Sequence, residues 1–325
     1  MPAQIASAGD PLGFGSLLAA AGTASADGSN AAPAATSLRV RPWAASYGRF
    51  DQLNSAGGAP GMRANGGAVV AGADLPLEMS LDRADDGQAA LGAALAYDFA
   101  DLNGTGLSDA QQQAYRISLY GWSSLGVSSH GVTWFGGSVD YAHVTGAATR
   151  QVGFGTDLGQ SRVTPSGDLV SGQILLARPV TAGGLNLTPQ AWLQGLHYGQ
   201  GGFSENGATG AELAVFPRSR NALRSVLSIS AARSFAVGEG MTLTPRTVLG
   251  WSHEFLDPTA QLNAGFAAGG PVFTVSGATP GRDALLAGAA LAAQLGATTL
   301  YVAYGASVAA NETTQTITAG LRHVW

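Results

Sequence analysis

The chain has 325 residues, which is long enough for one large domain or two domains of ordinary size. Charged residues make up only 11% of the sequence, and a net charge of −5 without any basic block argues against nucleic-acid binding. Cysteine is absent, which excludes a disulfide framework, thiolate metal sites and cysteine nucleophiles.

Residues 1–38 are rich in alanine, glycine, serine and proline and show no sustained periodicity. We interpret them as a linker that can hold a short helix near residues 16–21. No arginine or lysine precedes Arg39, so the positively charged start of a secretory signal peptide is missing. If the protein is exported, we expect this chain to be the C-terminal part of a longer one.

From Arg39 onward, apolar and polar side chains alternate within segments that are separated by clusters of glycine, asparagine, aspartate and proline. A period of two is typical of β-strands, because successive side chains point to opposite faces. We predict twelve strands, at residues 39–50, 63–77, 88–102, 112–126, 131–144, 166–180, 184–199, 222–237, 241–255, 283–295, 298–308 and 314–325.

The connections between these segments alternate in length. Short ones read VSSHG, VTAGG, VGEG and LGATT, whereas long ones cover residues 145–165, 200–221 and 256–282. Outer-membrane barrels have short turns at one end and long loops at the other, and a soluble sandwich is not expected to show this rhythm.

The two faces of the predicted strands differ in a way that bears on architecture. In 241–255, Leu249 and Trp251 lie on one face, opposite Arg246 and Glu254. The polar faces carry serine, threonine, glutamine, glycine and single arginines, which suits a water-filled interior better than an open sandwich surface. Aromatic residues near strand ends predict interfacial belts, and they are Trp43, Tyr97, Trp122, Trp134, Tyr141, Tyr198, Trp251, Phe255 and Trp325.

One stretch satisfies the length rule for a membrane helix, because no charged residue lies between Asp283 and Glu312. Its apolar residues nevertheless alternate with a period of two, and Gly288, Gln294 and Gly296 are poor choices for such a helix. We therefore favour two strands joined by a tight turn over a transmembrane helix.

The chain ends with ETTQTITAGLRHVW, in which one face carries Ile317, Ala319, Leu321, His323 and Trp325. The opposite face is mainly small or polar. A barrel pairs its last strand with its first, so a final strand that ends on an aromatic residue is consistent with barrel closure.

Several stretches follow one another along the chain in this order: WAASYGRFD (43–51), LGAALAY (91–97), YRISLYGWSSLG (115–126), the Gly-Phe-x-Glu-x-Gly run at 202–207 and the closing TAGLRHVW. Together they resemble the C-terminal translocator (β) domain of type V autotransporters, over about residues 39–325. The resemblance implies an all-β fold: a transmembrane antiparallel β-barrel of twelve strands at 39–325. Residues 1–38 would then be the end of a passenger, a linker or helix that threads the lumen.

The resemblance also implies a function, which is to anchor in the outer membrane of a Gram-negative bacterium and to translocate or display an N-terminal passenger. Its partners would be outer-membrane lipid, the β-barrel assembly machinery and the passenger segment. We expect no cofactor, no metal, no catalytic residue and no enzymatic activity in this chain. The polar residues that we place in the lumen are Arg116, Gln190, Gln194, Arg224, Arg246 and Glu254. Each is equally consistent with a structural ion pair or hydrogen bond.

In the resembling family, an alternating last strand with a final aromatic residue is read as an assembly signal. The matching positions are Ile317, Ala319, Leu321, His323 and Trp325, although His323 stands where an aromatic residue is commoner. Two alternatives remain: a stand-alone porin-like or adhesive barrel whose loops do the work, and a soluble β-sandwich that binds a ligand.

Overall fold

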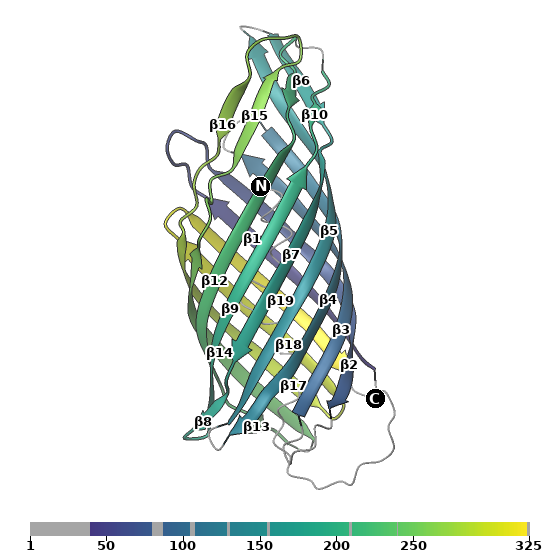
Figure 1. Ribbon diagram of the computed structural model, residues 1–325, viewed down its shortest axis with the longest axis vertical. Coiled ribbons are helices and arrows are strands. Elements are labelled where there is room, and N and C mark those ends of the chain that lie inside the picture. The colour runs from purple at the N-terminus through teal and green to yellow at the C-terminus, as the bar shows by residue number, and fades with distance from the viewer. Residues whose placement is uncertain are drawn as a thin grey trace.

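Twelve long antiparallel strands form the wall of a closed barrel in the computed structural model (Figure 1). The structure describes residues 40–79, 87–104, 108–128, 131–154, 157–207, 210–238 and 240–323. The wall strands are β1 (Arg41–Leu53), β2 (Met62–Met79), β3 (Gly87–Gly104), β4 (Ser108–Ser128), β5 (Gly131–Phe154), β7 (Ser166–Ala177), β9 (Leu185–Gln200), β12 (Arg218–Ala232), β14 (Met241–Glu254), β17 (Asp283–Leu295), β18 (Thr298–Ala309) and β19 (Glu312–His323).

Each wall strand corresponds to one of the twelve predicted segments, so the predicted barrel is confirmed. Strands that follow one another along the wall are paired, and β19 pairs with β1 from Trp43↔Arg322 to Leu53↔Glu312. This closure gives the backbone of the described wall strands partners on both sides. The soluble sandwich is therefore wrong. The predicted linker and helix within 1–38, and Trp325, lie outside the described residues.

The long connections cluster at one end of the barrel, which is uppermost in Figure 1. The stretch 145–154, predicted as loop, is a continuation of β5, and its residues 148–154 pair with β6 (Asp157–Val163). Above the wall, β10 (Phe203–Ser204), β11 (Leu213–Val215), β15 (Gln261–Phe266) and β16 (Phe273–Ser276) form a second sheet. These strands read as loops in the sequence because they lack the continuous apolar face of a lipid-contacting strand.

The short connections lie at the opposite end, where β8 (Val180–Ala182) and β13 (Phe235–Ala236) extend two of the hairpins. Gly183 and Gly184 form one of these turns with φ of 59° and 77°, in the left-handed region that favours glycine. The uncharged stretch 284–311 is the hairpin β17–β18, which turns at Gly296, so the strand interpretation is confirmed. Among the described residues, no helix is long and apolar enough to cross a membrane.

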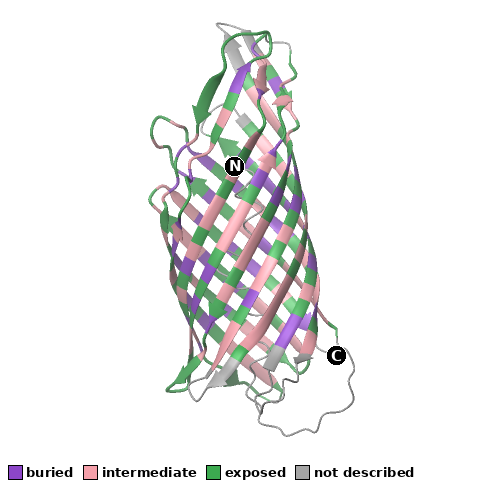
Figure 2. Cartoon of the chain, in the orientation of Figure 1, coloured by how far each residue is buried: buried purple, intermediate pink, exposed green. Residues whose placement is uncertain are grey.

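The two faces of the wall have opposite character, which Figure 2 shows as alternating exposed and buried bands along the strands. Large apolar side chains point outward and are exposed, among them Val69, Leu95, Ile117, Leu119, Val139, Ile174, Leu249, Leu285 and Ile317. Small side chains such as Ala68, Ala114, Ala142 and Ala303 are buried on the inner face. An apolar exterior around a small and polar interior is the arrangement of a barrel embedded in lipid.

The predicted aromatic belt is only partly correct. Tyr141, Trp251 and Phe255 are exposed on the outer face. Trp43 and Trp122 instead line the interior, and Tyr198 is buried. Each of these three residues lies an even number of positions from the inward polar residues of its own strand, so its side chain faces inward. Distance from the strand end alone did not predict which face such a residue occupies. Trp134 also leaves the belt, because its ring packs edge-to-face on Trp122 with centroids 5.1 Å apart.

The contrast between the two faces predicts different tolerance to charge at neighbouring positions of β5. Val139 is 62% exposed on the outer face, whereas Ser138 lines the interior. We expect Val139→Arg to lower the free energy of unfolding in lipid bilayers by about 2 kcal/mol, because an arginine there faces hydrocarbon. Ser138→Arg is the matched control and should cost little beside Asp140. Equal losses in urea unfolding followed by tryptophan fluorescence would contradict the assignment of faces.

Candidate functional site

The interior of the barrel holds a cavity of about 370 Å³. Residues of all twelve wall strands line it, so the closed wall itself positions the site. The charged residues that line it are Arg49, Arg116, Asp140, Arg220, Arg224, Glu254, Asp257, Arg282, Glu312 and Arg322. Serine, threonine, glutamine and glycine supply much of the remaining surface. We treat this lumen as the candidate functional site.

One buried network joins β1, β3 and β4 on the inner wall. The Tyr47 hydroxyl donates a hydrogen bond to Asp98 Oδ1 at 2.5 Å, and Arg116 Nη2 donates to the same oxygen at 3.0 Å. The Asp98 side chain is 1% exposed. A carboxylate buried to this extent is stable only with donors around it, so the arginine and the tyrosine act together. Because β1 and β4 are not neighbours, the network fixes the curvature of this part of the wall.

A second buried network crosses the closing seam of the barrel. Arg322 Nη2 on β19 donates to Asp74 Oδ2 on β2 at 2.8 Å. The hydroxyl of Tyr120 donates to the other oxygen of Asp74, and the indole Nε1 of Trp43 donates to Tyr120 at 2.6 Å. Nearer the loop-rich end, Thr314 donates to Asp51 across the same seam at 2.6 Å. The last strand is thus tied to the first strands by side chains as well as by backbone.

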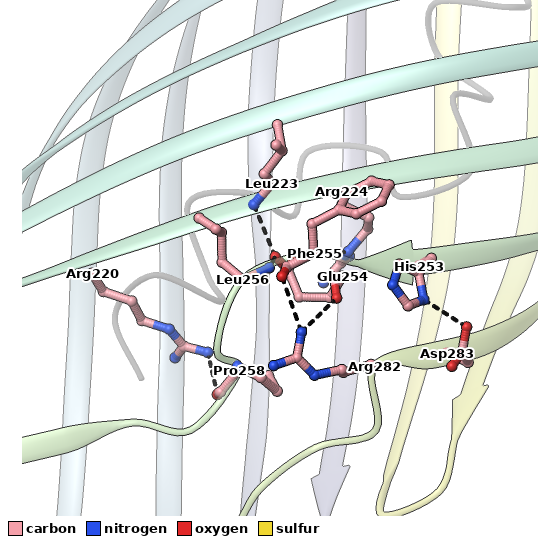
Figure 3. A network of polar contacts seen from close by, with 10 residues as sticks. All are labelled: Arg220, Leu223, Arg224, His253, Glu254, Phe255, Leu256, Pro258, Arg282 and Asp283. Carbon is pink, nitrogen blue, oxygen red and sulfur yellow. Dashed lines mark hydrogen bonds and ion pairs between the residues drawn. The ribbon is translucent and has the colours of Figure 1, made fainter.

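Glu254 organises the loop-rich end of the lumen (Figure 3). Its Oε1 accepts the backbone N–H of Leu223 at 2.8 Å and that of Leu256 at 3.1 Å. Arg224 Nε lies 3.8 Å from Oε2 on the cavity side. This carboxylate therefore fixes both the wall and the start of the long connection that follows β14.

Two further arginines hold the same connection over the cavity. Arg282 donates to the carbonyl oxygens of Glu254 and Phe255 at 3.2 and 3.0 Å, and Arg220 donates to that of Pro258 at 2.6 Å. Residues 257 and 258 consequently line the cavity. The backbone N–H of Thr259 donates to Asp257 and holds the pKa of that carboxyl below its usual range, so Asp257 stays ionised at the mouth of the lumen.

The structure places the predicted lumen residues as follows. Arg116 belongs to the Tyr47–Asp98 network, and Gln194 lines the cavity and donates to Gln173 at 3.0 Å. Gln190 is buried and accepts the indole N–H of Trp192 at 3.3 Å. Arg224 and Glu254 meet at the loop-rich end.

Arg246 stands apart from the other predicted lumen residues. It is buried on the inner face and does not line the cavity, and its Nε has no hydrogen-bond partner among the described residues. The six predicted residues thus do not form one cluster.

Sequence reasoning missed the residues that complete the two wall networks, namely Tyr47, Asp74, Asp98, Tyr120 and Arg322. A usable signal was present in the sequence. Asp98 has the same strand parity as Ala94 and Ala96, and small residues mark the inner face of a barrel. The partner of each acid could not be read in the same way, because it comes from another strand.

The predicted assembly-signal residues lie on β19. Ile317 and Leu321 are exposed on the outer face, as is Ala319. The ring of His323 pairs through Nδ1 with the Thr298 hydroxyl at 2.9 Å. Trp325 is outside the described residues, so its position remains a prediction.

The Tyr47–Asp98–Arg116 network predicts a strong energetic coupling. Asp98→Leu should lower the free energy of unfolding by about 3–5 kcal/mol, because it leaves a buried guanidinium without its anion. Adding Arg116→Met should recover most of this loss, and Asp101→Asn, on the exposed face of the same strand, serves as control. Strictly additive losses in urea unfolding would rule the coupling out.

Comparisons with known proteins support the fold. The β-domain of the Bordetella autotransporter BrkA is 16% identical, with a TM-score of 0.62, and the match covers 88% of this chain and 100% of that one. The translocator domain of NalP from Neisseria meningitidis is 13% identical, with a TM-score of 0.64 and coverage of 95% and 94%. The transport unit of AIDA-I from Escherichia coli is 11% identical, with a TM-score of 0.58 and coverage of 91% and 93%.

These identities establish similarity of fold alone, and the comparison with curated proteins found no match. A family model described as the autotransporter beta-domain matches residues 42–305, from β1 into β18. The polar lumen, the apolar outer wall and this match agree, and the chain therefore belongs to the autotransporter β-domain family, as an outer-membrane barrel for passenger secretion.

Proposed function

We propose that this barrel anchors in the outer membrane of a Gram-negative bacterium, and that it translocates an N-terminal passenger through its lumen and displays it at the cell surface. The observation that carries the proposal is a polar, charge-lined cavity inside a closed barrel with an apolar exterior. The stand-alone porin-like or adhesive barrel is not favoured, because the chain belongs to the autotransporter family. We assign no catalytic role to this chain.

The direction of transport follows from where the first strand begins. β1 starts with Arg41 at the barrel end that carries the short turns, and it runs toward the end that carries the long connections. A passenger that precedes β1 must therefore pass along the lumen to leave at the loop-rich end. We assign that end to the cell exterior and the short turns to the periplasm.

The lumen chemistry suits a chain that passes without being held. The charges of Arg116, Arg322 and Arg49 are matched by carboxylates of the wall itself, at 3.0, 2.8 and 2.5 Å. Between them, Ser118 and Gln194 offer neutral groups that exchange hydrogen bonds with water or with a passing backbone. Charges that are already paired attract a sliding segment weakly, which favours release over binding.

We also propose that the outward face of β19 serves as the address read by the β-barrel assembly machinery. It presents Ile317, Ala319 and Leu321 to lipid, and it continues through His323 toward Trp325 in the sequence. Because β19 must pair with β1 to close the wall, recognition of this strand would couple insertion to closure.

Transport through the lumen predicts that narrowing it blocks export. Ser118 and Ser171 line the cavity on β4 and β7. We expect Ser118→Trp/Ser171→Trp to abolish most surface display of a reporter fused upstream, as measured by protease accessibility on intact cells. Leu119→Trp/Val170→Trp places the same bulk on the outer face and should leave display intact. Full display by the narrowed barrel, in the presence of normal membrane assembly, would refute passage through this lumen.

The assembly proposal concerns the last residue. Deleting Trp325, or adding a charged tag directly after it, should reduce the fraction of chains that reach the membrane as heat-modifiable barrels. Trp325→Phe keeps an aromatic ring and is expected to assemble normally. Undiminished insertion of the truncated chain in cells would show that Trp325 carries no such signal.

A further inference from the structure

Two of the short connections repeat one sequence pattern. Residues 177–189 read ARPVTAGGLNLTP and residues 232–245 read ARSFAVGEGMTLTP, so each stretch begins with Ala-Arg and ends with Leu-Thr-Pro. The first links β7 to β9 through β8, and the second links β12 to β14 through β13 (Figure 1). Because β9 pairs with both β7 and β12, the two hairpins are neighbours at the end that we assign to the periplasm.

The repeated arginine and proline occupy the same place in both hairpins. The backbone N–H of Arg178 donates to the carbonyl oxygen of Pro189 at 3.1 Å, and that of Arg233 donates to the carbonyl oxygen of Pro245 at 3.3 Å. Strand pairing continues past each arginine without a change of register, so each arginine stands directly opposite its proline. Passenger transport gives neither arginine a role.

Both arginines are exposed on the outer face of the wall. Side chains an even number of positions apart on a strand share a face, and at this spacing each arginine has an exposed apolar residue on either side of it. These apolar residues are Leu176, Val180, Ile229 and Phe235. Each guanidinium group therefore belongs to the edge of the lipid-facing surface, where a long charged side chain reaches toward the headgroups.

The contacts of Arg233 show where its charge is directed. Its guanidinium Cζ lies 5.3 Å from the ring centroid of Phe235, which follows it toward the turn. The charged group is thus held away from the hydrocarbon and toward the level of the headgroups. None of the ion pairs among the described residues involves Arg233. A ring face accepts no ordinary hydrogen bond, so the guanidinium donors are left for an external acceptor.

The side chains around Arg233 distinguish between a lipid and a soluble anion. Leu243, which is opposite Phe235 in register, and Pro245 lie on the same outer face, which continues to exposed Leu249. A soluble anion gains nothing from these apolar groups, whereas the acyl chains of a lipid pack against them. The periplasmic leaflet of an outer membrane consists of phospholipids, and their phosphates lie at this boundary.

We propose that the Arg178 and Arg233 hairpins each bind the phosphate of an anionic phospholipid in the periplasmic leaflet. Arg233 carries the argument, and the repeated sequence extends it to Arg178. A guanidinium group suits a phosphate because its planar fork donates to two oxygens at once. The inference requires the lipid-facing wall and the assignment of the short turns to the periplasm, and it is independent of passenger export.

Native mass spectrometry of the full chain, titrated with phosphatidylglycerol or with phosphatidylethanolamine of the same acyl chains, tests the proposal. The ethanolamine lipid contains the same phosphate, but its own ammonium group neutralises it. We expect a preference of about fivefold per arginine for phosphatidylglycerol, the factor for one arginine beside an anionic lipid surface. Arg178→Gln/Arg233→Gln should remove the preference, and Arg178→Lys/Arg233→Lys should keep most of it because the charge remains.

Arg63→Gln is the matched control. Arg63 is exposed on the outer face at the opposite end, near Asn65 and opposite Asn103, so its loss should leave the preference unchanged. Heat-modifiable migration checks that each variant is folded, and excess glycerol phosphate should not displace the lipid.

Loss of the preference with glutamine and its retention with lysine would support the proposal. A preference that survives in the double glutamine variant would overturn it, as would an equal loss in the Arg63 control. Displacement of the lipid by glycerol phosphate would also overturn it, because the site would then be one for a soluble phosphate.

Discussion

Every other feature of this barrel depends on the pairing of β19 with β1. In lipid, no water is available to satisfy backbone N–H and C=O groups, so an open sheet would leave a row of unpaired groups in hydrocarbon. Eleven residue pairs, from Trp43↔Arg322 to Leu53↔Glu312, close that gap. Closure also divides the side chains of every strand into an outer and an inner set, and this division creates the lumen.

The inner set of side chains includes charged groups that the closed wall encloses. These charges must therefore find their partners within the barrel. Asp74 and Asp98 are satisfied by donors that include residues of non-adjacent strands, namely Arg322 of β19 for Asp74 and Tyr47 of β1 for Asp98. The same contacts that stabilise the wall pair Arg116 and Arg322 with carboxylates, so these two lumen charges are already neutralised.

The outer set of side chains changes in residue type along the barrel axis. Leucine, isoleucine and valine cover the middle of the wall, whereas tyrosine, tryptophan, histidine and aspartate occupy the edge near the long connections. His143 with Asp168, His197 with Asn221 and His253 with Asp283 each join two wall strands that a long connection links. These contacts therefore hold together the strand ends from which the long connections leave the wall.

Period-two alternation in the sequence was sufficient to predict the strands, their number and the inward side of Arg116, Arg224 and Glu254, because parity along a strand is a local property. The alternation could not predict the partners of those residues, because each partner comes from another strand. Asp98 and Tyr47 meet Arg116 only because the register of β1 to β4 brings them together, and Trp43 faces inward although it lies near a strand end. The sequence by itself thus determined the barrel and its two faces. Only the tertiary structure decided which charges of the inner wall are paired, because pairing depends on register and closure between strands distant in sequence.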